Sequence, residues 1–221
     1  MVLLEVQKIP TYSLYLVTSH EYSAGRNTLE VAEAAIGGGI DILQLREKTL
    51  PRPELVSLGK KLSTLCKKSN IVFIANDDPE LTVEIDADGV HFGQEDIKKY
   101  PIEKARALLG KDKLIGLSTH SLKEVEEANS LDINYIAFGP LFETKTKNYF
   151  LGTKDLNQAL ARSKFPVICI GGINLENIGQ LLKLGATNIA VIREITQSRD
   201  ITEKTRQLKT KLLEYKNASN R

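Results

Sequence analysis

The chain has 221 residues, 42% of them hydrophobic and 26% charged, a composition typical of a globular protein with a sizeable core. Lys and Arg total 30 against 28 Asp and Glu, and this balance argues against broad binding of nucleic acid, which needs a basic excess. No stretch approaches the roughly 20 apolar residues of a membrane span, and the apolar start of the chain is too short for a signal peptide. We therefore expect a cytoplasmic protein with neither nucleic-acid nor membrane partners.

The two cysteines carry no sign of a special role. Cys66 lies in a Lys-rich segment of helical pattern, and Cys169 lies in an apolar segment of strand character. Neither has metal-ligand spacing, and two cysteines do not make a disulfide framework. We expect buried or incidental thiols in a reducing compartment.

Eight short apolar segments, rich in β-branched residues, alternate along the chain with segments of helical period. Each is nearly continuous in apolar character, as in a parallel sheet that is buried on both faces. The expected strands are 13–18, 41–46, 71–76, 89–92, 114–119, 135–139, 166–171 and 188–192. Eight such units in 221 residues predict one α/β domain, a (β/α)8 TIM barrel over 1–221 with a short polar tail from about 216.

The segments between these strands carry the signals of helix ends. Ser121 and Glu124 have the spacing of a capping box, in which two side chains bind backbone N–H groups at the start of a helix. Gly185 has the place of a glycine that follows a helix. The expected helices begin after Asn27 and end at 37–39, begin after Ser121, run from Asn174 to Gly185, and run from about 202 to 215.

In a TIM barrel the active site lies at the carboxyl ends of the strands, so the polar residues that follow each apolar segment are the candidates. After the second strand, alternation points Gln44 and Arg46 to the same side, and Lys48 follows in the loop. An amide and two cations suit a pyrophosphate. The alternative is a cluster of solvated charges.

Carboxylates follow the third and fourth strands. Asp77 and Asp96 come from neighbouring strand ends, so their side chains are expected to converge on one Mg2+, which is typically held by one or two carboxylates, phosphates and water. Glu95 is an alternative ligand to Asp96. Such acidic pairs are also common N-caps of helices, which is the alternative interpretation.

Hydroxyls, a histidine and lysines follow the fifth and sixth strands. Ser118 and His120 end the fifth, and His120 is either a general acid or base or a plain loop residue. The loop 139–147 after the sixth strand contains threonines and lysines that suit a polyanion, unless it is only a solvated loop.

The seventh and eighth strands end in a predicted phosphate site. Barrels often bind phosphate there through backbone N–H groups and a helix N-terminus. Gly171 and Gly172 allow a close approach of the backbone, or serve only a tight turn, and Arg193 adds a guanidinium. The mouth of the barrel is thus expected to hold two anion sites, with Mg2+ near the first.

These residues together resemble the signatures of the thiamine phosphate synthase family and occur in the order of that family. The matching segments are 44–48, 76–77, 88–96, 139–142, 144–147 and 171–173. Each segment alone is a weak signal, but their combination is highly specific.

The resemblance implies two substrates, a pyrimidine pyrophosphate and a thiazole phosphate, with Mg2+ held by Asp77 and Asp96. Residues of the pyrimidine pocket would be Gln44, His91 and Gly93. Residues at the pyrophosphate would be Arg46, Lys48, Asn76, Ser118 and Lys147, of which Lys48, Ser118 and Lys147 act in catalysis. Residues at the thiazole phosphate would be Thr144, Thr146, Gly172, Ile192 and Arg193.

The implied reaction is attack by the thiazole nitrogen on the pyrimidine methylene, with pyrophosphate leaving first. The chain departs from the family pattern at three positions. Asp78 stands where the family commonly has Arg, Glu143 where it has Pro, and Arg193 where it has Ser. Arg193 is expected either to bind the phosphate or to pair with Glu194 or Asp78.

Two other functions are compatible with the pattern. A thiazole tautomerase of the same superfamily resembles the chain at 142–144 and would use His120 as its acid–base group, without Mg2+ or a pyrophosphate clamp. A non-catalytic barrel that binds a phosphorylated metabolite is the second. Retention of Lys48, Asp77, Asp96 and Lys147 favours the synthase. A homo-oligomer is possible.

Overall fold

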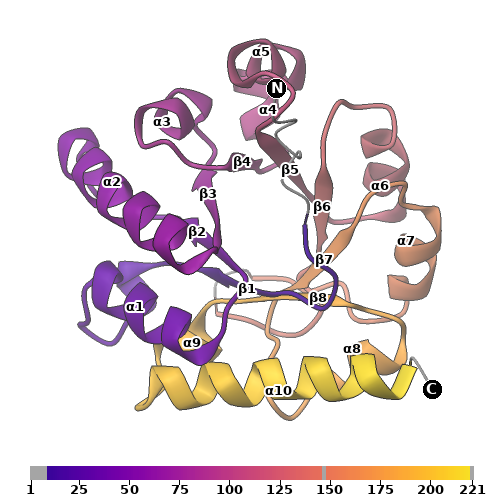
Figure 1. Ribbon diagram of the computed structural model, residues 1–221. Helices are drawn as coiled ribbons and strands as arrows, with labels where there is room; N and C mark the ends of the chain where they lie inside the picture. The colour runs from indigo at the N-terminus through magenta and orange to yellow at the C-terminus, as the bar shows by residue number, and fades with distance from the viewer. Residues whose placement is uncertain (1–8, 146–147, 220–221) are drawn as a thin grey trace, which may run out of the picture.

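The computed structural model describes residues 9–145 and 148–219, and its eight parallel strands close into one barrel in sequence order. Figure 1 shows the strands as a central ring with the helices outside it. The predicted TIM barrel is therefore confirmed. The strands are β1 (Leu14–Val17), β2 (Ile42–Leu45), β3 (Val72–Asn76), β4 (Gly89–Phe92), β5 (Leu114–Thr119), β6 (Tyr135–Phe138), β7 (Val167–Ile170) and β8 (Asn188–Val191).

The helices of the described residues connect successive strands up to β8. After β8 come α9 and α10, and α10 closes the outer ring beside α1 (Figure 1). They are η1 (His20–Tyr22), α1 (Thr28–Gly38), α2 (Arg52–Ser69), α3 (Pro79–Glu84), α4 (Asp96–Lys99), α5 (Ile102–Leu109), α6 (Leu122–Ala128), α7 (Leu156–Arg162), α8 (Ile178–Lys183), α9 (Arg193–Thr196) and α10 (Ile201–Ser219).

Side-chain caps set several helix starts where the sequence predicts them. Asn27 Oδ1 accepts from Glu30 N at 2.9 Å, and Ser121 Oγ accepts from Glu124 N at 3.2 Å. Two bounds differ from expectation. Asn174 forms a turn in which its Oδ1 accepts from the N–H of Glu176 and Asn177, so α8 begins only at Ile178. The final helix continues past residue 215 to Ser219.

Alternation along the strands divides the core into two layers. Tyr15 and Ile42 point into the barrel and pack with other inward residues, whereas Leu14 and Leu43 point outward against the helices. Because successive side chains of a strand lie on opposite faces, Gln44 shares the inward face with Ile42. The same rule therefore fills the interior with apolar side chains and places polar ones at its carboxyl end.

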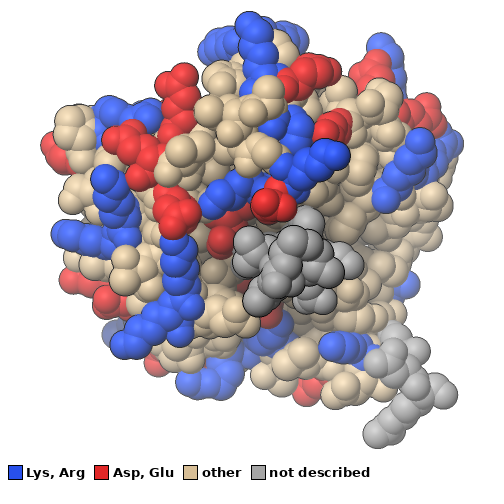
Figure 2. Space-filling view, turned by 45° about the horizontal axis from the view of Figure 1, so that its top comes forward, with Lys and Arg blue, Asp and Glu red and all other residues tan. Residues whose placement is uncertain are grey.

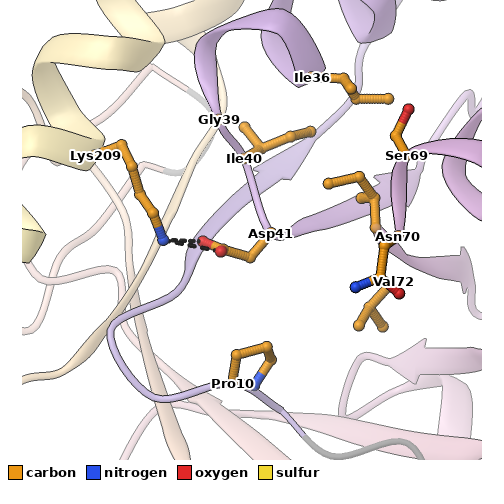
Figure 3. Close-up of a pocket in the computed structure, with 10 residues that line it drawn as sticks. Pro10, Ile36, Gly39, Ile40, Asp41, Ser69, Asn70, Val72 and Lys209 are labelled. Atoms are coloured by element: carbon orange, nitrogen blue, oxygen red, sulfur yellow. Dashed lines mark hydrogen bonds and ion pairs between the residues drawn. The ribbon is translucent and has the colours of Figure 1, made fainter.

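The amino end of the barrel is held by an ion pair. A pocket of about 580 Å3 opens there between the starts of β2 and β3 and α10. Figure 3 shows Lys209 reaching Asp41 across this pocket, with Nζ–Oδ distances of 2.6 and 2.8 Å. Asp41 also accepts from Leu14 N at 2.7 Å, and Lys209 donates to Tyr12 O at 3.1 Å. These charges satisfy each other, so this end serves stability, as is usual for the amino end of a TIM barrel.

Charges of both signs are interspersed over the face shown in Figure 2. This distribution agrees with the near balance of acidic and basic residues in the chain. No helix among residues 9–145 and 148–219 has the length and apolar character needed to cross a membrane.

Both cysteines are unpaired and buried, as predicted, and burial raises the pKa of each thiol to about 12. Because the thiolate is the reactive form, we expect Cys66 and Cys169 to resist a thiol reagent at pH 8 in the folded protein and to react at once in denaturant. Rapid labelling of either thiol in the folded protein would contradict this arrangement. The absorbance of the chromophore that the thiol reagent releases measures the labelling rate in the folded protein and in denaturant.

Candidate active site

The two aspartates after β3 have separate tasks. Asp78 is the N-cap of α3, and its Oδ1 accepts from Leu81 N at 2.8 Å. Asp78 also pairs with Arg52. Asp77 adopts a left-handed φ of 61°, a conformation that aspartate tolerates better than most residues, and its N–H donates to His91 O at 2.8 Å. The cap is thus supplied by Asp78, and the Asp77 carboxylate is left for the site.

The carboxylates of Asp77 and Asp96 meet at Gly93. Asp77 Oδ1 accepts from Gly93 N at 3.3 Å, and Asp96 Oδ2 lies 2.7 Å from where a Cβ would stand on that glycine. Burial, and next the charge of Asp96, raise the pKa of Asp77 to about 6. Glu95, the alternative ligand, is exposed and pairs with Lys98 at 2.6 Å. The geometry therefore favours Asp96 as the partner of Asp77.

Cations follow β2 on the same rim. Lys48 is exposed, and its charge acts to lower the pKa of Asp77, against the larger effects of burial and Asp96. Arg46 is partly buried, and its backbone N–H donates to Thr18 Oγ1 at 3.0 Å. The structure thus brings Lys48 into the electrostatic neighbourhood of the acidic pair.

Predicted and unpredicted side chains form a polar layer inside the barrel. Gln44 Nε2 donates to Asn76 Oδ1 at 2.7 Å, and Asn76 Nδ2 donates to Asp77 Oδ2. Gln44 Oε1 accepts from Tyr15 Oη at 2.9 Å. The layer therefore connects β1, β2 and β3 to the acidic pair.

The other half of this layer contains His91 and Ser118. His91 Nε2 and Ser118 Oγ lie 2.9 Å apart, and His91 Nδ1 lies 3.2 Å from Tyr135 Oη. The two tyrosine hydroxyls, of Tyr15 and Tyr135, are 3.1 Å apart. Burial lowers the pKa of His91 to about 4, so its imidazole is neutral at physiological pH. The sequence did not single out Tyr15 or Tyr135.

The loop after β6 packs against the glycines after β7. Phe142 N donates to Gly171 O at 3.0 Å, and a Cβ on Gly172 would stand 2.4 Å from Glu143 O. Only glycine fits this close approach, and Gly172 has a φ of 67°. Thr144 follows and is partly buried. The predicted contacts of Thr146 and Lys147 lie outside the described residues.

The end of β8 leads into the short helix α9, which begins at Arg193 after Ile192. Arg193 Nε donates to Gln197 Oε1 at 3.2 Å, and its guanidinium lies 5.7 Å from the centre of the Tyr22 ring. The two carboxylates expected as alternative partners of Arg193 pair with other residues. Glu194 pairs with Lys204 at 3.1 Å, and Asp78 pairs with Arg52.

His120 lies at the loop between β5 and α6. Its Nδ1 is 2.5 Å from Gly139 O, and its ring meets Tyr149 edge-on at 6.2 Å. Its N–H donates to Glu124 Oε2 at 2.6 Å, which is the second bond of the expected capping box displaced by one residue. These contacts support a structural role for His120, in which its side chain holds the loop between β5 and α6 against the end of β6.

Among the described residues, no cluster of three or more His, Cys, Asp and Glu side chains could hold a metal. An acidic pair alone is the donor set expected for Mg2+, which completes its shell with water and phosphate oxygens. The rim can therefore hold a divalent cation with a polyanion beside Lys48. The loops after β6, β7 and β8 lie together as candidates for a second anion.

Comparisons with known proteins place the chain in one family. The family model described as thiamine monophosphate synthase matches residues 14–195. A thiamine-phosphate synthase of Dictyoglomus turgidum is 40% identical over 96% of this chain and 96% of its own. One of Halalkalibacterium halodurans is 39% identical over 86% of this chain and 90% of its own. A thiamine phosphate pyrophosphorylase structure from Pyrococcus furiosus has a TM-score of 0.84 and 31% identity, covering 92% of this chain and 96% of that one. The chain thus belongs to the thiamine monophosphate synthase family, and it is a transferase.

Proposed function

We propose that the chain transfers the pyrimidinylmethyl group of 4-amino-5-hydroxymethyl-2-methylpyrimidine pyrophosphate to the nitrogen of hydroxyethylthiazole phosphate, giving thiamine phosphate and releasing pyrophosphate. The observation that carries this proposal is the meeting of the Asp77 and Asp96 carboxylates at Gly93, beside the polar layer that contains Gln44. Relatives named thiamine-phosphate synthase support it.

The first substrate would lie over the polar layer. Its pyrimidine ring would rest in a pocket made by Gln44, His91 and Gly93, which have amide, imidazole and backbone groups within one hydrogen-bonded layer. Its pyrophosphate would lie on the rim, against side chains that carry positive charge or donate hydrogen bonds. These are Arg46, Lys48, Asn76 and Lys147, with Ser118 beside them.

Asp77 and Asp96 would hold Mg2+. Burial and mutual repulsion make two adjacent carboxylates unfavourable by themselves, as the raised pKa of Asp77 expresses, so the pair fits a divalent cation. When bound, Mg2+ neutralises the charge of the pyrophosphate and orients it.

The second substrate would place its phosphate at the loops after β6, β7 and β8. Backbone N–H groups at Gly172, Ile192 and Arg193, with a short helix after β8, would form this site, at the place where TIM barrels often bind phosphate. Hydroxyls of Thr144 and Thr146 would add contacts. The thiazole nitrogen would then face the pyrimidine methylene across the mouth of the barrel.

The reaction would be dissociative. As the carbon–oxygen bond breaks, the pyrophosphate gains negative charge and the pyrimidine methylene becomes a carbocation. Lys48 and Lys147 would bind the departing charge more strongly than the ground state, which is what accelerates the step. The thiazole nitrogen would then form the new carbon–nitrogen bond, with its proximity supplied by the second phosphate site.

Among the three positions where the chain departs from the family pattern, Arg193 is expected to have the clearest effect on substrate binding. If its guanidinium binds the thiazole phosphate, Arg193→Ser should raise the KM for that substrate about 10- to 150-fold, because hydrogen bonds to charged groups contribute about 1.5–3 kcal/mol. The KM for the pyrimidine substrate should not change. Steady-state kinetics with each substrate varied measures both values.

Arg199→Ser, at an exposed position, is the matched control for Arg193→Ser. A KM for thiazole phosphate within twofold of the parent would assign the Arg193 side chain to Gln197 and Tyr22 alone.

Incubation with each substrate singly and with both tests the proposed function. Thiamine phosphate should form only when both are present. Isomerisation of a thiazole substrate alone would indicate the tautomerase, and binding without turnover would indicate a phosphometabolite-binding barrel.

A cytoplasmic location is part of the proposal and is supported by two unpaired, buried thiols. A homo-oligomer is also part of the proposal, and sedimentation of the protein would test it.

A further inference from the structure

The polar layer inside the barrel is one unbroken chain of hydrogen bonds. It begins at Ser118 and ends at the carboxylate of Asp77. Its members are, in order, Ser118 of β5, His91 of β4, Tyr135 of β6, Tyr15 of β1, Gln44 of β2, Asn76 of β3 and Asp77, which follows β3. Tyr15, Gln44, His91 and Tyr135 are buried, so bulk water does not compete for these bonds.

The direction of donation follows from the acidic end. A carboxylate only accepts, so Asn76 presents Nδ2 to Asp77 and its Oδ1 to Gln44. Gln44 must then donate from Nε2, which leaves its Oε1 to accept from the Tyr15 hydroxyl at 2.9 Å. Each amide has one donor side and one acceptor side, so neither can reverse alone.

The same direction continues through the tyrosines. The proton of Tyr15 is committed to Gln44, so in the 3.1 Å contact Tyr135 donates to Tyr15. The Tyr135 oxygen must then accept from His91 Nδ1. A buried imidazole with one protonated nitrogen has its other nitrogen as an acceptor, so His91 Nε2 accepts the proton of Ser118 Oγ.

We propose that Tyr15 and Tyr135 are positioning residues that hold His91 as the Nδ1–H tautomer and so commit the Ser118 hydroxyl proton to His91. Ser118 Oγ then meets the substrate as a hydrogen-bond acceptor. The matching group is the exocyclic amino group of the pyrimidine, a donor, and not a phosphate oxygen. The identity of this ligand rests on the proposed function, whereas the tautomer does not.

The packing around Tyr135 supports a fixed direction. A Cβ on Gly116 would stand 2.1 Å from Cζ of the Tyr135 ring, so the absence of a side chain at Gly116 makes the space for that ring. The Tyr135 ring also stacks on His91, with centroids 5.5 Å apart. The hydroxyl of Tyr135 is therefore held between Tyr15 and His91 and has few other orientations.

The test is the tautomer of His91 in the substrate-free protein. The chain has three histidines, so nitrogen-15 labelling of histidine gives few signals, and His20→Gln and His120→Gln assign the remaining one. Nδ1 of His91 should have the pyrrole type of resonance and Nε2 the pyridine type. In Tyr15→Phe, Tyr135 loses its acceptor and can donate to His91 Nδ1, so the tautomer should shift toward Nε2–H although residue 15 does not touch His91.

Tyr100→Phe is the matched control, because Tyr100 stacks on Phe92 outside the layer and its loss should leave the His91 signals unchanged. An Nε2–H or doubly protonated His91 in the parent would overturn the proposal. So would an unshifted tautomer in folded Tyr15→Phe.

Kinetics give a second readout for Tyr15→Phe. The KM for the pyrimidine substrate should rise about 2- to 10-fold, as for one neutral hydrogen bond, and the KM for thiazole phosphate should stay constant. An equal rise in both would contradict a positioning role. Product formation by the parent is measured separately, so failure of the tautomer and failure of the proposed function are distinguishable.

Discussion

Replacing Asp77 with alanine is expected to abolish Mg2+-dependent turnover while the barrel stays folded. The variant removes one of two carboxylates that meet at Gly93, and with it the charge that fits a divalent cation. Product formation at increasing Mg2+ gives the activity, and thermal unfolding followed by circular dichroism gives the fold.

Asp77→Asn separates charge from backbone conformation. Residue 77 has a left-handed φ of 61°, which asparagine tolerates and alanine resists, so alanine alone would mix strain with loss of charge. Asp112→Ala, in an exposed turn before β5 at the opposite end of the barrel, is the control. If Asp77→Asn keeps full activity with normal Mg2+ dependence, Asp77 is not a metal ligand.

Lys48→Ala and Lys147→Ala are each expected to lower kcat by about 10²- to 10³-fold, the usual effect of removing one preorganised charge partner in a transition state. The loss should appear mainly in kcat, because the leaving pyrophosphate carries more charge in the transition state than in the ground state. Rapid-quench kinetics of pyrophosphate release measure this step.

Lys48→Met retains the aliphatic length of lysine and should match Lys48→Ala, which would assign the loss to charge. Lys111→Ala, exposed in the turn before β5, is the control for removal of a surface lysine. A change confined to the KM for thiazole phosphate in either site variant would place that lysine at the other substrate.

The barrel was predictable because its strands are buried on both faces. β4 and β5 have the predicted bounds, and the other strands differ only at their ends. Each of these ends differs by one residue, where residues such as Thr18 and Asp41 still bond the neighbouring strand, Thr18 N to Gln44 O and Asp41 N to Leu14 O at 2.9 Å each. The predicted helix start at Asn174 was wrong because an asparagine that caps a turn has the same sequence pattern as one that caps a helix.

The polar layer was only half predictable. Gln44, Asn76 and Asp77 stand out in the sequence because polar residues at the end of an apolar run need an explanation. Tyr15 and Tyr135 do not, because a tyrosine in a buried strand has the same pattern as a core phenylalanine. The one available signal is Gly116, a glycine inside a strand, which often marks the close approach of another group.

Residue spacing alone does not predict which of the neighbouring residues Asp77 and Asp78 caps α3. Either Asp77 or Asp78 could have capped α3, and only the backbone decides, since Asp78 is extended and Asp77 is left-handed. Arg193 is similar. Its place after β8 was clear, but its contact with Tyr22 depends on η1, which no sequence pattern linked to β8, and its bond to Gln197 depends on the short helix α9.

A stoichiometric assay with both phosphorylated substrates, in Mg2+ and again after chelation with EDTA, tests the proposed reaction and the metal together. Equal amounts of thiamine phosphate and pyrophosphate are expected with Mg2+, and loss of both products with EDTA. Undiminished formation of thiamine phosphate in EDTA would contradict the role of the acidic pair. Absence of thiamine phosphate in Mg2+ would contradict the proposed function itself.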